Sequence, residues 1–368
     1  MQGLAQCCAE RGQKALRWVL GKLNNGQTAL AQQILVRIDD RSHVGEARRE
    51  AARITQILRF DAIQAGRVAI AITEAATNIL KHAGTGKILL FPLLLDRLSG
   101  LEILVLDRGP GVANLERSLT DGYSTAGTMG GGLGALVRAS HKFDIHSTLG
   151  RGTAMRLEIW ATPTVPAAHL TEWGAVSLAK DGQVVTGDAW SLEGEGDVRT
   201  ILVADGLGHG PDAARAARAA VEAFACNSSA KPADLMRICH AALAGTRGAA
   251  AAAAQFTAAH RQGSFAGVGN ITCRVESADE RKELASHNGT LGHDLPRVQQ
   301  FGFTLPTDAI LVLHTDGLAT RWAVSDYPGL MGKHAGLIAA VLYRDHERGN
   351  DDVTVVVLKN KSEPAAKH

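Results

Sequence analysis

The sequence predicts an α+β protein of two domains, and three observations support this. The chain has 368 residues, a length at which two domains can each bury a core of their own. A stretch with two prolines and little periodicity separates two segments that carry different motifs. In both segments, apolar strands end at an aspartate and run into glycine-rich turns. We expect an N-terminal extension, a first domain, a linker, a second domain and a tail, at residues 1–30, 31–160, 161–172, 173–360 and 361–368.

Composition excludes several classes of partner. The formal net charge is only +2, which favours neither nucleic acid nor an anionic membrane, and aromatic residues make up just 4%, too few for base-stacking platforms. The sequence contains no apolar run near the roughly 18 residues of a membrane helix, and we expect no signal peptide. Five scattered cysteines without CxxC spacing fit a reducing compartment. These features predict a cytoplasmic protein.

The first domain begins with ordinary periodic elements. Residues 34–38 alternate like a strand, and residues 42–58 have the apolar spacing of a helix. Residues 87–95 and 101–106 read as two further strands. The second of these ends at Asp107, which precedes the glycines of an Asp-x-Gly-x-Gly turn, Gly109 and Gly111.

A helix expected at residues 72–84 carries an unusual polar face. Glu74, Asn78 and His82 stand at i, i+4 and i+8, opposite the apolar side chains. A carboxylate can accept a proton and an amide oxygen can ligate a metal, so the face suits chemistry. A plain solvated face is the alternative.

Two glycine-rich segments follow. Residues 127–135 hold five glycines, four of them directly before a helical pattern (Gly130, Gly131, Gly132 and Gly134), and residues 150–159 read Gly-x-Gly-Thr before a strand. Backbone N–H groups of such a loop, with the helix N-terminus behind it, can bind phosphates. A flexible linker has a similar composition, so the order of all these motifs is the stronger signal.

That ordered set resembles the GHKL ATPase superfamily, and within it the anti-sigma-factor serine kinases of the RsbT type, over about residues 30–160. The resemblance implies a Bergerat-type α/β sandwich, with helices on one face of a mixed sheet, that uses ATP and Mg²⁺. It implies that Glu74 is the catalytic base for a serine hydroxyl, that Asn78 holds Mg²⁺, and that Asp107 binds the adenine amino group. The other cofactor-binding positions it implies are Gly109, Gly111, Gly130, Gly131, Gly132, Leu133, Gly134, Thr153 and His82, although His82 alternatively only orders the helix end.

The second domain is organised around residues 202–217. A short apolar strand ends at Asp205-Gly206, a glycine-rich turn follows, and Pro211 suits the first position of a helix. A carboxylate beside exposed backbone carbonyls is a good ligand set for a hard divalent cation. On its own, Asp-Gly is more often a simple turn.

Three further acidic sites lie at predicted strand ends. Asp188 follows a glycine, Asp316 follows residues 311–315, and Asp351 precedes a β-branched strand, with Asp352 as the second choice. A cluster of these carboxylates would repel itself unless cations bind there. Paired divalent ions can activate water and clamp a phosphoryl group. By default, His209 and His314 are supporting or packing residues.

Two stretches of this domain read less simply. Six alanines at 249–254 predict either a small-residue helix or a tightly packed strand. Residues 255–275 predict two strands around a turn at Gly263.

The ordered motifs of this half resemble the SpoIIE-type metal-dependent serine/threonine phosphatases, and within them the RsbX-like enzymes, over about residues 170–360. These motifs are, in chain order, GDAW, ADGLGHGPDA, GVGNI, TDGL and NDDVTVVV. The resemblance implies a four-layer α-β-β-α fold. It implies that Asp188 and Asp205 are catalytic and bridge two Mn²⁺ or Mg²⁺ ions, with the metal shells completed by the Gly206 carbonyl, Asp316 and Asp351.

The sequence therefore predicts a bifunctional switch protein. Its first half would phosphorylate a serine of a STAS-domain antagonist, or of another phosphoprotein of a sigma-factor or stressosome pathway, and its second half would hydrolyse phosphoserine or phosphothreonine. Three alternatives stay open. In the first, ATP binding only gates the phosphatase. In the second, the first half is a non-enzymatic module that sequesters a partner, and in the third, weaker one, the phosphatase half hydrolyses a small phosphate ester.

Overall fold

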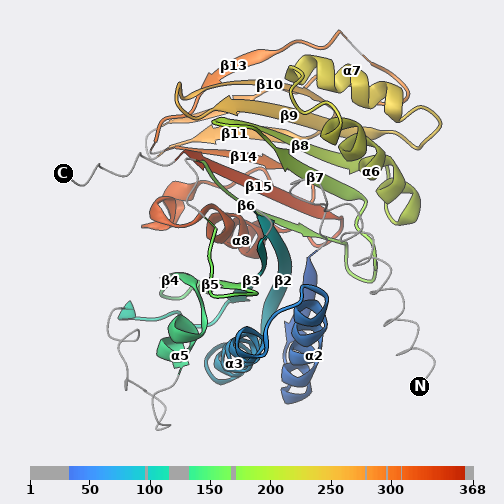
Figure 1. Ribbon diagram of the computed structural model, residues 1–368. Coiled ribbons are helices and arrows are strands. Elements are labelled where there is room, and N and C mark those ends of the chain that lie inside the picture. The colour runs from blue at the N-terminus through green and yellow to red at the C-terminus, as the bar shows by residue number, and fades with distance from the viewer. Residues whose placement is uncertain are drawn as a thin grey trace.

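The computed structural model describes residues 33–95, 98–115, 132–166, 171–277, 280–295, 297–307 and 309–360. Its layers stack along one direction (Figure 1): helices, the sheet of the first domain, one helix of the second domain, that domain's two sheets, and its outer helices. Each of the three sheets has five strands. None of the helices in these described ranges is long and apolar enough to cross a membrane.

The first sheet is entirely antiparallel, whereas the sequence resemblance implied a mixed sheet. Each neighbouring pair of its described strands has antiparallel register. The strand order is β1-β2-β3-β5-β4, with bounds Ile34–Ile38, Gly86–Leu95, Leu98–Asp107, Gly152–Trp160 and Lys142–Thr148.

Three helices cover one face of this sheet: α2 (Arg41–Ile57), α3 (Ala62–Asn78) and α5 (Gly132–Ala139). Aspartates cap the first two, because Asp40 accepts from the Ser42 N–H at 2.6 Å and Asp61 from the Gln64 N–H at 2.7 Å. Apolar residues of the helices and the sheet form one buried cluster that fixes where α3 lies.

The helix predicted at 72–84 differs from the structure at both ends. It begins ten residues earlier, at Ala62, and its last turn, Ile79–Ala83, is a π-helix that ends at Gly84 with φ +77°. A π-turn changes the 3.6-residue phase, so His82 does not continue the face of Glu74 and Asn78. Ile79 is buried and His82 is exposed.

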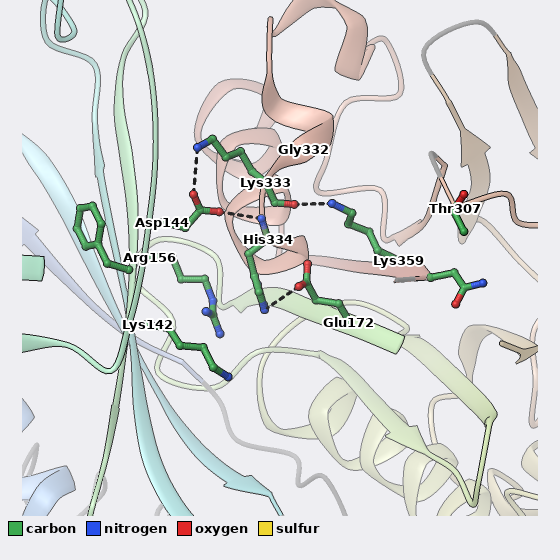
Figure 2. A pocket seen from close by; sticks show the side chains of 11 residues that line it. Lys142, Asp144, Arg156, Glu172, Thr307, Gly332, Lys333, His334 and Lys359 are labelled. Carbon is green, nitrogen blue, oxygen red and sulfur yellow. Dashed lines mark hydrogen bonds and ion pairs between the residues drawn. The ribbon is translucent and has the colours of Figure 1, made fainter. Parts of the chain in front are cut away.

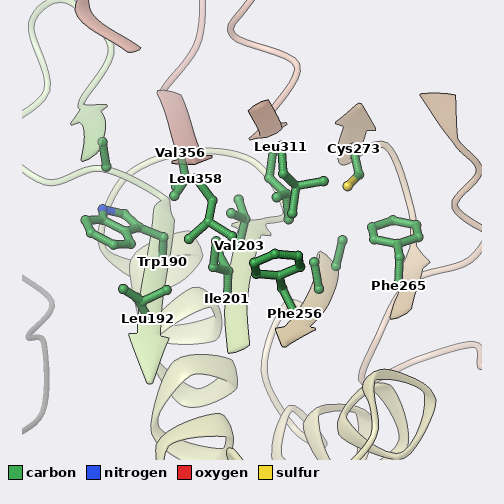
Figure 3. Close-up of a cluster of buried hydrophobic side chains, with 14 of the residues drawn as sticks. Trp190, Leu192, Ile201, Val203, Phe256, Phe265, Cys273, Leu311, Val356 and Leu358 are labelled. Carbon is green, nitrogen blue, oxygen red and sulfur yellow. The ribbon is translucent and has the colours of Figure 1, made fainter. Parts of the chain in front are cut away.

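The second domain contains two further sheets packed face to face. One has the order β13-β10-β9-β8-β7, with bounds Phe301–Thr304, Gln262–Val268, Ala249–Thr257, Val198–Gly206 and Asp188–Glu193. The other has the order β12-β11-β14-β15-β6, with bounds Arg281–Leu284, Thr272–Glu276, Ile310–His314, Val353–Asn360 and Thr171–Leu178. Buried aromatic and aliphatic side chains fill the space between them (Figure 3).

The six alanines form a strand rather than a helix. Ala249, Ala251 and Ala253 face the outer helices, and the alternate alanines join the core between the sheets. Small side chains on both faces let the layers approach closely. One other prediction was wrong in detail, because the hairpin turn lies at residues 258–261 instead of Gly263. Strand β6 begins at Thr171.

Helices α6 (Pro211–Ala225) and α7 (Pro232–Ala242) cover the outside of the sheet that holds β8, and α8 (Ala335–His346) covers the other sheet. Two single 3₁₀ turns, Val324–Asp326 and Leu330–Gly332, precede α8. This arrangement confirms the predicted four-layer fold. Residues 335–344 of α8 are all buried, because its far side packs on Leu89, Leu104 and Ala154 of the first sheet.

Candidate nucleotide and carboxylate sites

Helix α3 carries two of the predicted nucleotide-site residues. Glu74 and Asn78 stand one turn apart near its C-terminal end, and both are partly buried. A Cβ added at Gly132 would lie 3.6 Å from Asn78 Oδ1, so the amide faces the first turn of α5. The structure therefore brings the amide of Asn78 to a helix N-terminus, where anions bind well.

Asp107 is the last residue of β3, and its carboxylate is held from two sides. Its Oδ1 accepts the backbone N–H of Gly109 at 2.9 Å and that of Thr153 at 3.1 Å. Burial raises the pKa of Asp107, while these two hydrogen bonds and nearby Arg344 oppose the rise. With Oδ1 engaged, Oδ2 is available to accept from an amino group.

Close approach of neighbouring atoms explains the glycines that follow Asp107. A Cβ at Gly109 would lie 2.8 Å from the Ala83 Cβ, and one at Gly111, where φ is +76°, would lie 2.5 Å from the Thr148 carbonyl oxygen. Leu133 and Gly134 lie in the first turn of α5. The predicted lid residues Gly130 and Gly131 fall outside the described residues. His82 is exposed on the π-turn, and its charge would favour the ionised form of Asp107.

A second set of carboxylates gathers at one end of the β7–β8 pair. Asp188 and Asp205 are direct partners across the two antiparallel strands. Asp188 Oδ2 accepts from the Thr315 hydroxyl at 2.8 Å, whereas its buried Oδ1 has no hydrogen-bond partner among the described residues. Burial, reinforced by Asp205, raises the pKa of Asp188 well above its usual range.

Three more aspartates influence the ionisation of Asp188 and Asp205. Burial raises the pKa of Asp205 to about 7, with further contributions from Asp316, Asp351 and Asp352. The amide of Asn270 donates to Asp316 Oδ2 at 2.8 Å.

Asp351 and Asp352 have different surroundings. Both carboxylate oxygens of Asp352 accept backbone N–H groups, from Lys180 at 2.7 Å and from Gly187 at 2.6 Å. Asp351 is exposed and accepts only from the N–H of Asp352, at 2.9 Å, among the contacts of the described chain. Asp351 thus has oxygens to offer a ligand, and Asp352 braces the loop.

The oxygen atoms of this centre are suitable ligands for divalent cations. Across the described ranges, no three His, Cys, Asp or Glu side chains surround a point closely enough to enclose an ion by themselves. The centre nevertheless combines a buried oxygen of Asp188 that has no partner among the described residues with carboxylates that raise one another's pKa, an arrangement that bound cations would stabilise. At Gly206 a Cβ would lie 2.1 Å from the Ala213 carbonyl oxygen, so only glycine fits at that turn.

Sequence reasoning missed two supporting residues. Asn270 and Thr315 hold Asp316 and Asp188 by the bonds above, and their signals were the GVGNI motif and the residue before Asp316. His314 is a packing residue: it is fully buried beside Trp322, its Nδ1 is hydrogen-bonded to the Thr315 carbonyl at 2.8 Å, and burial lowers its pKa to about 4.

A cavity of about 480 Å³ lies apart from both sites, between the two domains (Figure 2). Both acidic side chains that line it lie beside basic ones. Asp144 binds Lys333 at 3.1 Å, and Glu172 Oε2 lies 3.7 Å from the His334 ring. The cavity therefore belongs to the contact between the domains.

Comparison with known proteins identifies both halves. Residues 38–159 match the histidine kinase-like ATPase domain, and residues 195–361 match stage II sporulation protein E (SpoIIE). The serine/threonine-protein kinase RsbT of Bacillus subtilis (strain 168) is 32% identical over 128 residues, which is 35% of this chain and 96% of that protein. The chain belongs to the RsbT kinase family, fused to a SpoIIE-type phosphatase.

Solved structures also resemble this kinase–phosphatase fusion. RsbX in complex with magnesium has a TM-score of 0.46 and 21% identity, over 53% of this chain and 98% of that one. The phosphatase domain and regulatory fragment of SpoIIE from Bacillus subtilis has a TM-score of 0.45 and 15% identity, over 99% of this chain and all of that one.

Proposed function

We propose that this protein both adds and removes a phosphoryl group on a regulatory partner protein. The proposal is supported by the arrangement of two separate groups of side chains in one chain: the candidate nucleotide site around Asp107 and Asn78, and the carboxylate centre around Asp188 and Asp205. By similarity to RsbT, the partner belongs to a sigma-factor regulatory pathway, and a STAS-domain antagonist is our specific candidate.

In the kinase half, each residue has one task. Asp107 accepts the adenine amino group, and the glycines beside it admit the base. Asn78 would hold Mg²⁺ through its amide oxygen, and the N-terminus of α5 beside it would bind the phosphates. Glu74, one turn earlier on α3, accepts the proton of the serine hydroxyl as that oxygen attacks the γ-phosphorus. The bond from the γ-phosphorus to the β-phosphate oxygen breaks, and ADP leaves with the electron pair of that bond.

In the phosphatase half, two Mn²⁺ or Mg²⁺ ions would be held by four carboxylates and one backbone carbonyl: Asp188, Asp205, Asp316, Asp351 and the Gly206 carbonyl. Such ions supply activation of water and neutralise phosphoryl charge. Thr315 and Asn270 orient two of the carboxylates, and Asp352 fixes the loop before β15 through backbone N–H groups.

Transfer of labelled phosphate tests the proposal. Purified protein would be incubated with γ-labelled ATP, Mg²⁺, Mn²⁺ and a candidate STAS-domain protein. We expect transient label on the partner with the wild type and persistent label with Asp205→Ala. Glu74→Ala should give no label while partner binding is retained.

Other outcomes point to the alternatives. If neither protein labels the partner but ATP changes phosphatase activity, the first half is a nucleotide gate. If partner binding occurs without any effect of ATP, the first half is a sequestering module. Either result contradicts the bifunctional proposal.

A further inference from the structure

Helix α8 belongs to the phosphatase half, yet it is fixed to the kinase half at both ends. At its N-terminal end, the His334 N–H donates to Asp144 Oδ2 of β4 at 2.8 Å, beside the Lys333–Asp144 ion pair (Figure 2). At its C-terminal end, Lys87 of β2 donates to the Tyr343 hydroxyl at 2.8 Å and pairs with Glu347. The helix is therefore held against the first sheet from β4, at one edge, to β2.

The most informative of these contacts is made by Arg344. This side chain is 4% exposed, and its Nη1 donates to the backbone carbonyl oxygen of Asp107 at 3.3 Å. Its Nε and Nη2 are both bonded to the carboxylate of Asp345 at 2.8 Å, which fixes the guanidinium plane. The peptide that presents the adenine-binding carboxylate is thus held by a residue of the other domain.

The space around the Asp107 carbonyl leaves little freedom. A Cβ at Gly152 would lie 2.1 Å from that oxygen, so the backbone of β5 lies directly against it. In addition, Arg108 donates to the carbonyl of Arg344, which makes the link between β3 and α8 reciprocal. Movement of the Asp107 backbone would require α8 to move as well.

The chain that leaves α8 leads directly to the carboxylate centre. The Arg348 N–H donates to the Gly317 carbonyl at 2.9 Å, and the Ala319 N–H donates to the His346 carbonyl at 2.9 Å. These bonds tie the end of α8 to the segment just after Asp316. Three residues beyond Arg348 stands Asp351, and a Cβ at Gly317 would lie 2.0 Å from the Asp352 carbonyl oxygen.

We propose that Arg344 is a positioning residue for the nucleotide site, and that residues 344–348 link nucleotide binding to cation binding at the carboxylate centre. The inference rests on the proposed nucleotide and metal sites but requires no turnover by either half. Nucleotide on Asp107 restrains the end of α8, and this restraint orders the segments that carry Asp316 and Asp351. Because such coupling is reciprocal, Mn²⁺ must tighten nucleotide binding by the same factor.

The test measures two equilibria in the full-length protein. One is the Kd of a fluorescent, non-hydrolysable ATP analogue, with and without Mn²⁺ under constant Mg²⁺. The other is the Kd of Mn²⁺ by calorimetry, with and without the analogue. In the wild type we expect each ligand to lower the Kd of the other about fivefold.

Variants separate positioning from general loosening of the interface. Arg344→Met should weaken binding of the ATP analogue about fivefold to tenfold and abolish the effect of each ligand on the affinity for the other. Arg344→Lys should restore part of the affinity and part of the coupling. The double variant Arg344→Met with Asp345→Asn also removes the carboxylate that Arg344 would otherwise leave behind, and it should behave like Arg344→Met. Lys333→Ala removes an interdomain ion pair at the opposite end of α8 and should retain wild-type coupling.

Two results would overturn the inference: wild-type Kd values that do not depend on the other ligand, or Arg344 variants, shown to be folded by circular dichroism, with unchanged coupling. Failure of the proposed function is recognised separately. If label is never transferred but the two Kd values remain coupled, the bifunctional proposal fails and the coupling stands. If label is transferred and Arg344→Met has no effect, only the coupling fails.

Discussion

Asp107 shows how a single strand-end residue is prepared for a ligand. Its Oδ1 is taken up by the N–H groups of Gly109 and Thr153, and its backbone oxygen by Arg344. The side chain is thereby fixed with one oxygen left for recognition. A neutral amide of the same shape would keep the internal bonds but present an N–H₂ group to the adenine amino group.

We therefore expect Asp107→Asn to weaken ATP binding by about 10-fold to 100-fold, the range for a lost hydrogen bond to a charged group. Equilibrium titration with a fluorescent ATP analogue in Mg²⁺ measures this. The matched control is Asp39→Asn, which neutralises an exposed carboxylate of the same domain. An Asp107→Asn protein with wild-type affinity would remove Asp107 from the adenine site.

Asn270 allows a comparable prediction for the carboxylate centre. Its amide orients Asp316, and loss of a group that orients a ligand commonly costs 10-fold to 100-fold in metal affinity. Asn270→Ala should raise the Mn²⁺ concentration for half-maximal hydrolysis of p-nitrophenyl phosphate by about that factor. Asn227→Ala, which removes a bond to the Ala223 carbonyl, should not. Equal Mn²⁺ requirements for wild type and Asn270→Ala would contradict the assignment of Asp316.

Glu193, at the end of β7, makes stability depend on pH. Burial raises its pKa from 4.5 to about 7, so between these pH values the folded protein binds a proton that the unfolded chain releases. Stability therefore falls as pH rises through this window. Glu193→Gln should be more stable than wild type by about 1 kcal/mol at pH 8, a figure reduced for solvent screening, and similar at pH 4.5. Urea unfolding at both pH values checks this, with exposed Glu195→Gln as control; a pH-independent difference would refute it.

At the scale of elements, the crossing of α8 over β6 depends on two glycines. A Cβ at Gly174 would lie 2.1 Å from the Gly336 Cα, with backbone on both sides and no flexible side chain to yield. Gly174→Ala should lower the free energy of unfolding by about 1–3 kcal/mol.

Gly66 in α3 is the matched contrast, because a Cβ there would meet nothing within 4 Å. Gly66→Ala should raise the free energy of unfolding by about 0.5–1 kcal/mol through its effect on helix propensity. Urea denaturation of both variants decides the matter. Equal effects would show that backbone contact between α8 and β6 is not the limiting constraint.

Most strands and all five strand-end aspartates could be predicted from the sequence, since alternation and Asp-Gly turns are local signals. Elements whose form depends on neighbours could not. The alanine strand β9 is selected by the two layers it separates, and the π-turn at Ile79–Ala83 breaks a period that reads as continuous helix. Pairing partners were also hidden, which is why the first sheet was expected to be mixed.

At the scale of the whole molecule, the two functional halves could be predicted, but their contact could not. The predicted boundaries at residues 160 and 173 remain predictions, and they say nothing of α8. A signal was present: residues 335–343 are apolar on all sides, which is typical of a helix buried on both faces. The charged cluster Glu102, Arg156 and Glu158 is buried for the same reason, because the phosphatase half covers that face of the first sheet.

This shared contact predicts cooperative unfolding. One buried cluster contains Leu89 and Leu104 of the first domain together with Val176 and Ile338 of the second. Exposing either domain alone would uncover that cluster, so we expect one calorimetric transition, followed equally by far-UV circular dichroism and by fluorescence of the second domain's tryptophans. An ATP analogue at 100 times its Kd stabilises the folded state by about 2.7 kcal/mol and should move the entire transition upward by several degrees. Two separate transitions, with only one shifted by the analogue, would mean that the domains unfold independently and that α8 contributes little to their union.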